Sequence, residues 1–264
     1  MISPTLTPIN EITVSDVQQF FNTKSELSQS TNKHIRYLLN SIFESALEDD
    51  LVVRNVMTSK RLVIRGGENP RKALTSVQVQ NICQQMPELK LQERLLLSLL
   101  LYTGMRRGEI LALEWKNVDL AGGLIHVVQS ADFPDNNNPS LKAPKSKAGF
   151  RVIPILPPLK DVLLEAQSQA VGCFLIGDGD APCTKRAYQW LYDKIKERIN
   201  LYGATAHVFR HTFITMSSVF LDPKTLQSIA GHSKCDITLN RYAHAQQEQI
   251  AKAGEKLTDL YVAS

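Results

Sequence analysis

The sequence predicts a protein that is mostly α-helical with a small antiparallel sheet, arranged in two domains. Residues 15–56 show the three- and four-residue apolar repeat of amphipathic helices. Residues 59–71 combine basic residues, a glycine pair and a proline, which is typical of a linker. Residues 72–264 predict several helices interrupted by short strand-like segments. We therefore expect a helical domain over residues 1–58, a linker, and a mixed α/β domain over 72–264.

Two helices are expected in the first domain, at residues 15–24 and 30–50. Ser30 or Thr31 is a suitable N-cap for the second helix, because a hydroxyl side chain can accept a hydrogen bond from a free amide of the first turn. Apolar residues form one stripe along this helix. They are Ile35, Leu38, Leu39, Ile42, Phe43 and Ala46.

The second domain opens with a helix capped by Thr75 and ending near Met86, followed by a strongly apolar helix over residues 92–102. Strands are expected within 122–130 and 150–155, because β-branched and apolar residues gather there. The Asn-, Pro- and Lys-rich stretch between them predicts a loop or a loose hairpin. Further helices are expected at residues 158–170, 184–200, 206–220 and from about 246.

Composition sets limits on function. The net charge of +4 and the isoelectric point near 8.8 permit a polyanionic partner without requiring one. The four cysteines show neither zinc-ligand spacing nor a CxxC pair, so we expect reduced thiols in a cytoplasmic protein. The most apolar run, residues 95–102, is far shorter than the roughly 20 residues that span a bilayer, and we expect no membrane association.

The first two motifs contain basic side chains. The stretch TGMRRGEILALEW places Arg106 and Glu109 three residues apart, so that they can pair on one helical turn. Taken alone, such a pair is usually a surface ion pair. The stretch APKSKAGFRVIPI places Lys145 and Lys147 just before a strand, and taken alone it is typical of a solvated basic hairpin tip.

The other two motifs contain histidines. The stretch AHVFRHTFIT puts His207 and Arg210 on one helical face among apolar residues that leave little solvent for the cation. In IAGHSKCDITLNRYAH, Gly231 is positioned to end a helix, His232 follows at once, and Tyr242 comes ten residues later. Taken alone, this tyrosine is most simply a packing residue.

In this order the four motifs resemble those of the tyrosine recombinase (phage-type integrase) family. The match covers residue 72 to the C-terminus, which resembles the catalytic domain, and the first block resembles the helical, SAM-like core-binding domain. The resemblance implies a site-specific recombinase or integrase that cleaves and rejoins DNA through a 3′-phosphotyrosyl intermediate, for integration or excision of a mobile element. It implies a prokaryotic or phage-encoded protein that needs no cofactor and no metal.

The resemblance also assigns roles to individual residues. Arg106 and Arg210 would clamp the non-bridging oxygens of the scissile phosphate, because a guanidinium offers two parallel donors. Tyr242 would be the nucleophile and His207 the base or proton acceptor for its phenol. Glu109 would orient Arg106.

The remaining roles are less closely defined by the motifs. His232 would donate a hydrogen bond to a non-bridging oxygen. Lys147, preferred to Lys145 because it lies nearer the strand, would protonate the departing 5′-oxygen. Candidate DNA-binding residues are Lys142, Lys145, His211 and Arg241. The implied partners are double-stranded DNA, a homotetramer on that DNA, and accessory DNA-bending or directionality proteins.

The first block departs from the family pattern, and the packing of the C-terminal stretch stays open. The first block is short, and we expect an N-terminal truncation of the core-binding domain, whether as a fragment, a mis-called start or a minimal form. The alternative function is a truncated or degenerate family member that binds DNA without completing recombination. A type IB topoisomerase-like enzyme and a helical interaction module are weaker alternatives. The C-terminal stretch, residues 245–264, suits packing on its own domain or on a neighbouring protomer.

Overall fold

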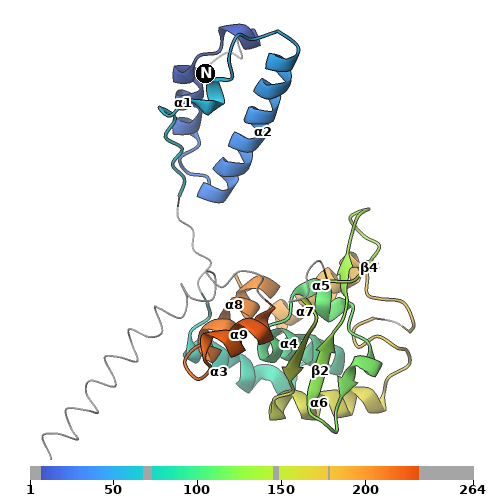
Figure 1. The fold of residues 1–264 in the computed structure, drawn as a ribbon. Helices are drawn as coiled ribbons and strands as arrows, with labels where there is room; N and C mark the ends of the chain where they lie inside the picture. The colour runs from blue at the N-terminus through green and yellow to red at the C-terminus, as the bar shows by residue number, and fades with distance from the viewer. Residues whose placement is uncertain (1–6, 68–72, 145–148, 178, 232–264) are drawn as a thin grey trace, which may run out of the picture. The chain divides into compact units, whose positions relative to one another are not determined.

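The structure is a computed structural model that describes residues 7–67, 73–144, 149–177 and 179–231. The helix expected from about residue 246 lies outside these ranges. The chain divides into two compact units, Met1–Arg71 (unit 1) and Lys72–Ser264 (unit 2), and each is described by itself (Figure 1).

Unit 1 is built on two helices, α1 (Val14–Thr23) and α2 (Gln29–Glu48), with the short 3₁₀ helices η1 (Ile9–Glu11) and η2 (Val56–Thr58) beside them. The N-cap of α2 is Ser28, not Ser30 or Thr31 as expected. The Ser28 hydroxyl accepts a hydrogen bond from the Thr31 amide at 3.1 Å, so the helix begins one residue before Ser30.

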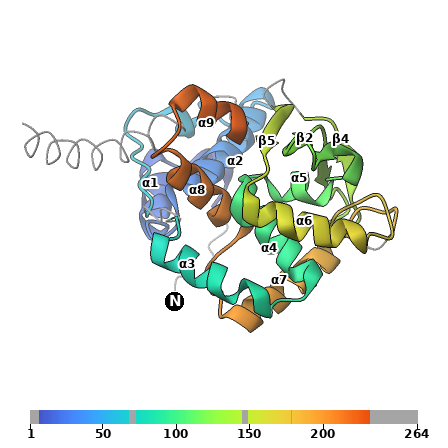
Figure 2. The same cartoon turned by 90° about the horizontal axis from the view of Figure 1, so that it is seen from below.

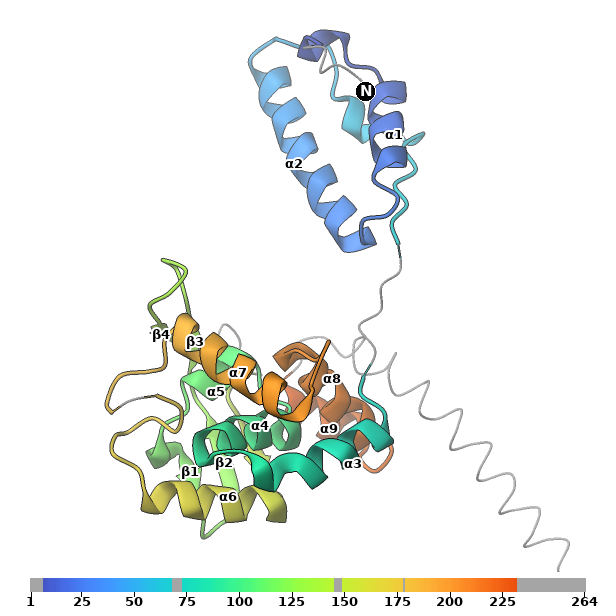
Figure 3. The ribbon, with the colours of Figure 1, turned by 180° about the vertical axis from the view of Figure 1, so that it is seen from behind.

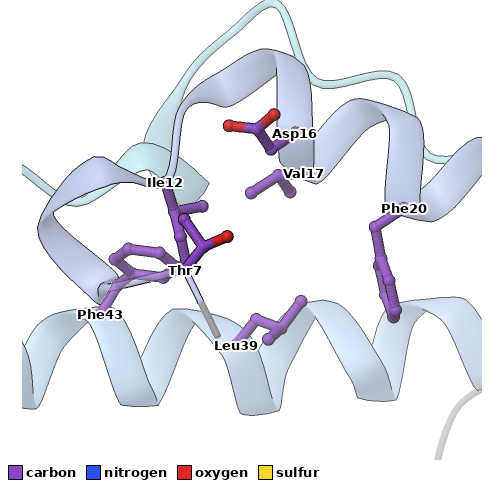
Figure 4. Close-up of a pocket in the computed structure, with 7 residues that line it drawn as sticks. All are labelled: Thr7, Ile12, Asp16, Val17, Phe20, Leu39 and Phe43. Carbon is purple, nitrogen blue, oxygen red and sulfur yellow. The ribbon is translucent and has the colours of Figure 1, made fainter. Parts of the chain in front are cut away.

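The core of unit 1 lies between α1, α2 and the segment that follows them. It consists of Val17, Phe21, Phe43, Ala46, Val52, Val56, Met57 and Leu62. Leu39 and Phe43 of α2 face Phe20 of α1 across a pocket of about 360 Å³ (Figure 4). The predicted stripe is only partly buried, since Leu38 is 61% exposed and Ile42 is 46% exposed. The stripe is therefore wider than the face of α2 that the described part of unit 1 covers.

The first part of the predicted linker packs on unit 1. Leu62 is buried, and the backbone of Val63 exchanges two hydrogen bonds with the side-chain amide of Gln18, at 2.8 and 2.9 Å. The amide of Gly67 donates to the carbonyl of Leu27 at 2.8 Å. A Cβ atom on Gly66 would lie 2.4 Å from the backbone nitrogen of Gln29. Close backbone approach, not linker flexibility, therefore explains a glycine here.

Unit 2 is organised around one helix, α4, in which every side chain from Leu95 to Leu101 is buried. A helix that is apolar on all sides belongs in a core, and α4 lies between α6 and α7 and also packs on α8 (Figure 3). The helices of unit 2 are α3 (Ser76–Gln85), α4 (Leu91–Thr103), α5 (Arg107–Leu111), α6 (Pro157–Ser168), α7 (Lys185–Ile199), α8 (Ala206–Ser217) and α9 (Pro223–Ala230), with 3₁₀ turns η3 (Met86–Glu88) and η4 (Trp115–Asn117).

The sheet of unit 2 is small and antiparallel, as expected. Its strand order is β1-β2-β5, and Ile125 of β2 pairs with Ile153 of β5 in the core. The segment expected as a loop or loose hairpin contains a separate strand pair, β3 with β4. The strands are β1 (Val118–Asp119), β2 (Leu124–Val127), β3 (Ser130–Asp132), β4 (Ser140–Lys142) and β5 (Arg151–Pro154). The predicted class, mostly helical with small antiparallel sheets, is confirmed.

No helix in the described ranges has both the length and the apolar character needed to cross a bilayer.

Candidate active site

Two residues of the predicted motifs, Arg106 and Arg210, meet at the C-terminal end of α9. The N-cap of this helix is Asp222, whose carboxylate accepts from the amides of Lys224 and Thr225, each at 3.0 Å. It ends at Gly231, which has a left-handed φ of 66° and confirms the helix end expected from the sequence. In Figure 2, α9 lies beside α8 and β5.

Each of the last three carbonyl oxygens at this end accepts a hydrogen bond from a different arginine. The pairs are Ile229 with Arg151 Nε at 2.7 Å, Ala230 with Arg210 Nη2 at 2.5 Å, and Gly231 with Arg106 Nη2 at 3.0 Å. The carbonyls of a helix C-terminus lack helical partners and carry partial negative charge, so guanidiniums are favourable donors there.

Arg106 stands at the N-cap of α5, directly after the turn that ends α4. Its amide donates to Glu109 Oε2 at 2.7 Å, and its Nη1 donates to Oε1 at 2.8 Å, so the pairing expected from the three-residue spacing is present. The turn is made by Gly104 with a φ of 62°. The Arg106 side chain is 47% exposed, whereas Glu109 is buried. Arg106 can therefore reach a ligand outside the protein while it stays held from inside.

Arg151 was not among the predicted site residues. Its side chain is only 2% exposed, and its Nη1 and Nη2 donate to the two oxygens of Glu109 at 3.0 and 2.8 Å. The signal that could have found it is strand alternation. Arg151 lies two residues before the buried Ile153 on β5, so the two side chains share the inward face of the sheet. A basic residue at an inward strand position requires a buried partner.

The charge on Glu109 follows from these neighbours. Burial by itself raises the pKa of its carboxyl, but the hydrogen bonds and positive charges of Arg151 and then Arg106 outweigh burial, so the net pKa lies below the ordinary value. Glu109 is thus an ionised carboxylate at neutral pH, shared by two guanidiniums.

Arg210 is buried in the middle of α8. Its Nη1 donates to the carbonyl of Gly104 at 2.6 Å, and its Nη2 to that of Ala230. His207 lies one turn earlier on the same helix and is exposed. His211 is partly exposed, and its Nδ1 lies 3.2 Å from the hydroxyl of Thr215. Of the predicted HxxR pair, Arg210 thus contacts the end of α4 and the end of α9.

Lys142 lies on strand β4, where its ammonium pairs with Asp132 at 2.9 Å. The other predicted residues fall outside the described ranges. They are Lys145, Lys147, His232, Arg241 and Tyr242. Within the described ranges, no three His, Cys, Asp or Glu side chains gather as metal ligands would.

The mostly helical fold and the motif order define the tyrosine recombinase class. Residues 72–249 match the family model described as the phage integrase family, and the chain belongs to that family. The assignment to this class of site-specific recombinases is confirmed.

Relatives support the same assignment. The chain is 26% identical to a tyrosine recombinase XerC-like protein of Caldanaerobacter subterraneus subsp. tengcongensis, over 93% of this chain and 71% of the relative. It is 25% identical to the transposase of transposon Tn916 from Enterococcus faecalis, over 90% of this chain and 64% of the relative, so it spans less than two thirds of that protein. The Tn1549 transposon integrase, solved in complex with a circular intermediate DNA, shares the fold with a TM-score of 0.73 at 23% identity, over 92% of this chain and 87% of that one.

Proposed function

We propose that this protein is a DNA strand-exchange enzyme that cleaves and rejoins its target through a 3′-phosphotyrosyl intermediate on Tyr242, for integration or excision of a mobile element. The observation that carries the proposal is the convergence of Arg106 and Arg210 on the end of α9. These arginines come from two separate motifs, and the chain continues from that helix end directly into His232.

The arginines suit the chemistry of a phosphodiester. In-line attack by a phenol oxygen forms a new P–O bond while the bond to the 5′-oxygen breaks, and negative charge builds on the non-bridging oxygens between these events. Fixed guanidiniums stabilise that charge because they need no reorganisation as it develops. Arg106 is oriented by Glu109 and Gly231, and Arg210 by Gly104 and Ala230.

Proton transfers complete the reaction. The phenol of Tyr242 is mostly neutral at pH 7 and must lose its proton to attack, and His207 would accept it. Lys147, or Lys145 in the same segment, would protonate the leaving 5′-oxygen. His232 would donate to a non-bridging oxygen. The phosphotyrosyl bond keeps the energy of the broken linkage, so a second 5′-hydroxyl can reverse the step on another strand.

Double-stranded DNA is the proposed substrate, bound by a homotetramer with accessory DNA-bending or directionality proteins. The net charge of +4 and the structural likeness to an integrase solved with DNA support the choice of DNA.

Covalent trapping tests this proposal. The protein is incubated in EDTA with a nicked suicide duplex that carries the boundary of the mobile element encoding it, and products are separated on a denaturing gel. We expect a protease-sensitive, slow-migrating DNA band whose adduct maps to Tyr242. DNA binding without any band would favour the alternative, a family member that no longer cleaves.

A matched pair of tyrosine substitutions tests whether Tyr242 is the nucleophile. Tyr242→Phe removes only the attacking hydroxyl, so the band should vanish while DNA affinity stays within about three-fold, because affinity comes mainly from phosphate contacts. Tyr202→Phe removes the hydroxyl of a tyrosine that is 77% exposed, and it should leave the band intact. An undiminished band from Tyr242→Phe would remove this residue from the reaction.

A further inference from the structure

One buried cation, Arg151, joins three parts of the proposed site. It donates to Glu109 in α5 and to Ile229 in the last turn of α9, and it begins the strand that follows the segment with Lys145 and Lys147. We propose that Arg151 is a positioning residue for strand cleavage, which holds Glu109 against Arg106 and fixes the helix end that leads into His232. This inference rests on the proposed function for its catalytic consequence.

The hydrogen bonds around Glu109 show how the first part works. Oε1 accepts from Nη1 of Arg106 and Nη1 of Arg151, and Oε2 accepts from the amide of Arg106 and Nη2 of Arg151. The carboxylate therefore has two donors from each arginine. Removal of Arg151 leaves one guanidinium as the only described counter-charge of a buried carboxylate.

The contrast in exposure between the two arginines assigns different roles to them. Arg106 is half exposed and can bind a phosphate, whereas all three guanidinium nitrogens of Arg151 already donate to Glu109 or to the carbonyl of Ile229. With Arg151 present, the charge of Glu109 is balanced by a residue that takes no part in DNA contact. Without it, Glu109 competes with the phosphate for the guanidinium of Arg106, because opposite charges in a desolvated site attract strongly.

The bond to Ile229 supplies the second part. Nε of Arg151 lies 2.7 Å from that carbonyl, so the same side chain ties β5 to α9. Two residues later the chain reaches Gly231 and then His232. The end of α9 is thus set by β5 through Arg151, by α8 through Arg210 and by α5 through Arg106.

The test compares Arg151→Gln and Arg151→Lys with Arg198→Gln. Arg198 donates through Nε to Glu93, another buried glutamate of unit 2, at 3.0 Å. This pair is a matched control because it links α7 to α4 and does not include the arginines that bind the end of α9. For each full-length variant, single-turnover cleavage of the suicide duplex, DNA affinity and thermal unfolding are measured.

We expect Arg151→Gln to slow cleavage by about 100-fold, the loss typical of a slightly misplaced catalytic group, with DNA affinity changed by less than about three-fold. Arg151→Lys should recover part of the rate, since it keeps the charge but not the fork. Arg198→Gln should cleave at the normal rate. If Arg151→Gln fails to fold, Arg151→Lys carries the comparison. A normal cleavage rate in either folded Arg151 variant overturns the proposal.

A pH profile separates positioning from a general loss of structure. The charged groups facing Glu109 among the described residues are Arg106 and Arg151, and His126 of β2 lines a small space next to it. In Arg151→Gln, burial is opposed only by Arg106, so the pKa of Glu109 rises. As the pH is lowered, the cleavage rate should therefore begin to fall at a higher pH in Arg151→Gln than in the unsubstituted protein. A rate lowered equally at every pH counts against the proposal.

Hydrogen exchange tests the link to α9 without any DNA cleavage. In the DNA-free protein, amides at the end of α9 should exchange faster in Arg151→Gln than in Arg198→Gln. Equal exchange overturns the link. This exchange measurement needs no cleavage activity, so it tests the link even if the unsubstituted protein forms no covalent product. The absence of a covalent product would count against the proposed function alone.

Discussion

At the scale of single residues, the site contains three arginines that are buried to different extents. Arg106 is half exposed, whereas Arg151 and Arg210 are enclosed, and all three donate to carbonyls at one helix end. The fork geometry of arginine suits each position because each guanidinium serves two acceptors in different directions. The ammonium of lysine lacks this planar fork.

Because Arg210 is enclosed and Arg106 is half exposed, substitution of each by lysine should have a different effect on the free energy of unfolding. Arg210→Lys should abolish cleavage and also lower the free energy of unfolding by about 1–3 kcal/mol, because the shorter lysine side chain lacks the fork that reaches the carbonyls of both Gly104 and Ala230 and leaves a buried acceptor unpaired. Arg106→Lys should impair cleavage with a smaller effect on stability, since the Arg106 side chain is 47% exposed and Arg151 still donates to both oxygens of Glu109. Urea unfolding and single-turnover cleavage check both; equal stabilities for the two variants would contradict the burial argument.

At the scale of elements, the turn between α4 and α5 sets the position of Arg106. Gly104 adopts a left-handed φ, and a Cβ there would lie 2.4 Å from the ring of Phe213 on α8. Its carbonyl is also the acceptor for Arg210. One glycine thus ends a core helix, lets α8 approach, and places both clamp arginines relative to each other.

Gly104→Ala is therefore expected to destabilise the protein more than Gly123→Ala. Both glycines have a left-handed φ, which costs an alanine about 1–2 kcal/mol, but a Cβ on Gly123 meets nothing within 4 Å. The overpacking at Gly104 should add about 1–3 kcal/mol. Phe213→Ala in the Gly104→Ala background should recover part of that difference in urea unfolding. If the two glycine variants unfold alike, the contact with Phe213 does not determine the turn.

The elements also show what local sequence can and cannot predict. The helix after Thr75, the apolar helix α4 and the end of α9 at Gly231 follow from caps, periodicity and a glycine within each segment, and all were predicted. Arg151 was missed because its partner Glu109 lies in another motif. The glycine pair near residue 66 looked flexible because the backbone that it packs on, near Gln29, is distant in sequence.

At the scale of the whole molecule, the two units have separate cores and different charge. Unit 1 contains as many acidic as basic residues, so the net charge of +4 lies in unit 2. Among the described residues, eight side chains form the buried core of unit 1, whereas the main core of unit 2 is several times larger. Small domains bury a smaller fraction of their surface and are correspondingly less stable. Unit 1 should therefore unfold first.

The two tryptophans, Trp115 and Trp190, both lie in unit 2, which makes this order measurable. Tryptophan fluorescence follows unit 2 alone, whereas far-ultraviolet circular dichroism follows helices of both units. In urea, the dichroism signal should start to fall at a lower concentration than the fluorescence signal, because non-coincident probes reveal more than one cooperative unit.

Substitutions in each core then identify the transitions. Val17→Ala removes buried apolar volume from unit 1 and should move only the early part of the dichroism curve, leaving the fluorescence midpoint unchanged. Ile195→Val does the same in unit 2 and should lower the fluorescence midpoint. Coincident curves that shift together in both variants would mean that the chain unfolds as one cooperative body. Independent curves would mean that each unit folds on its own core, so that site variants in unit 2 can be compared without a contribution from unit 1.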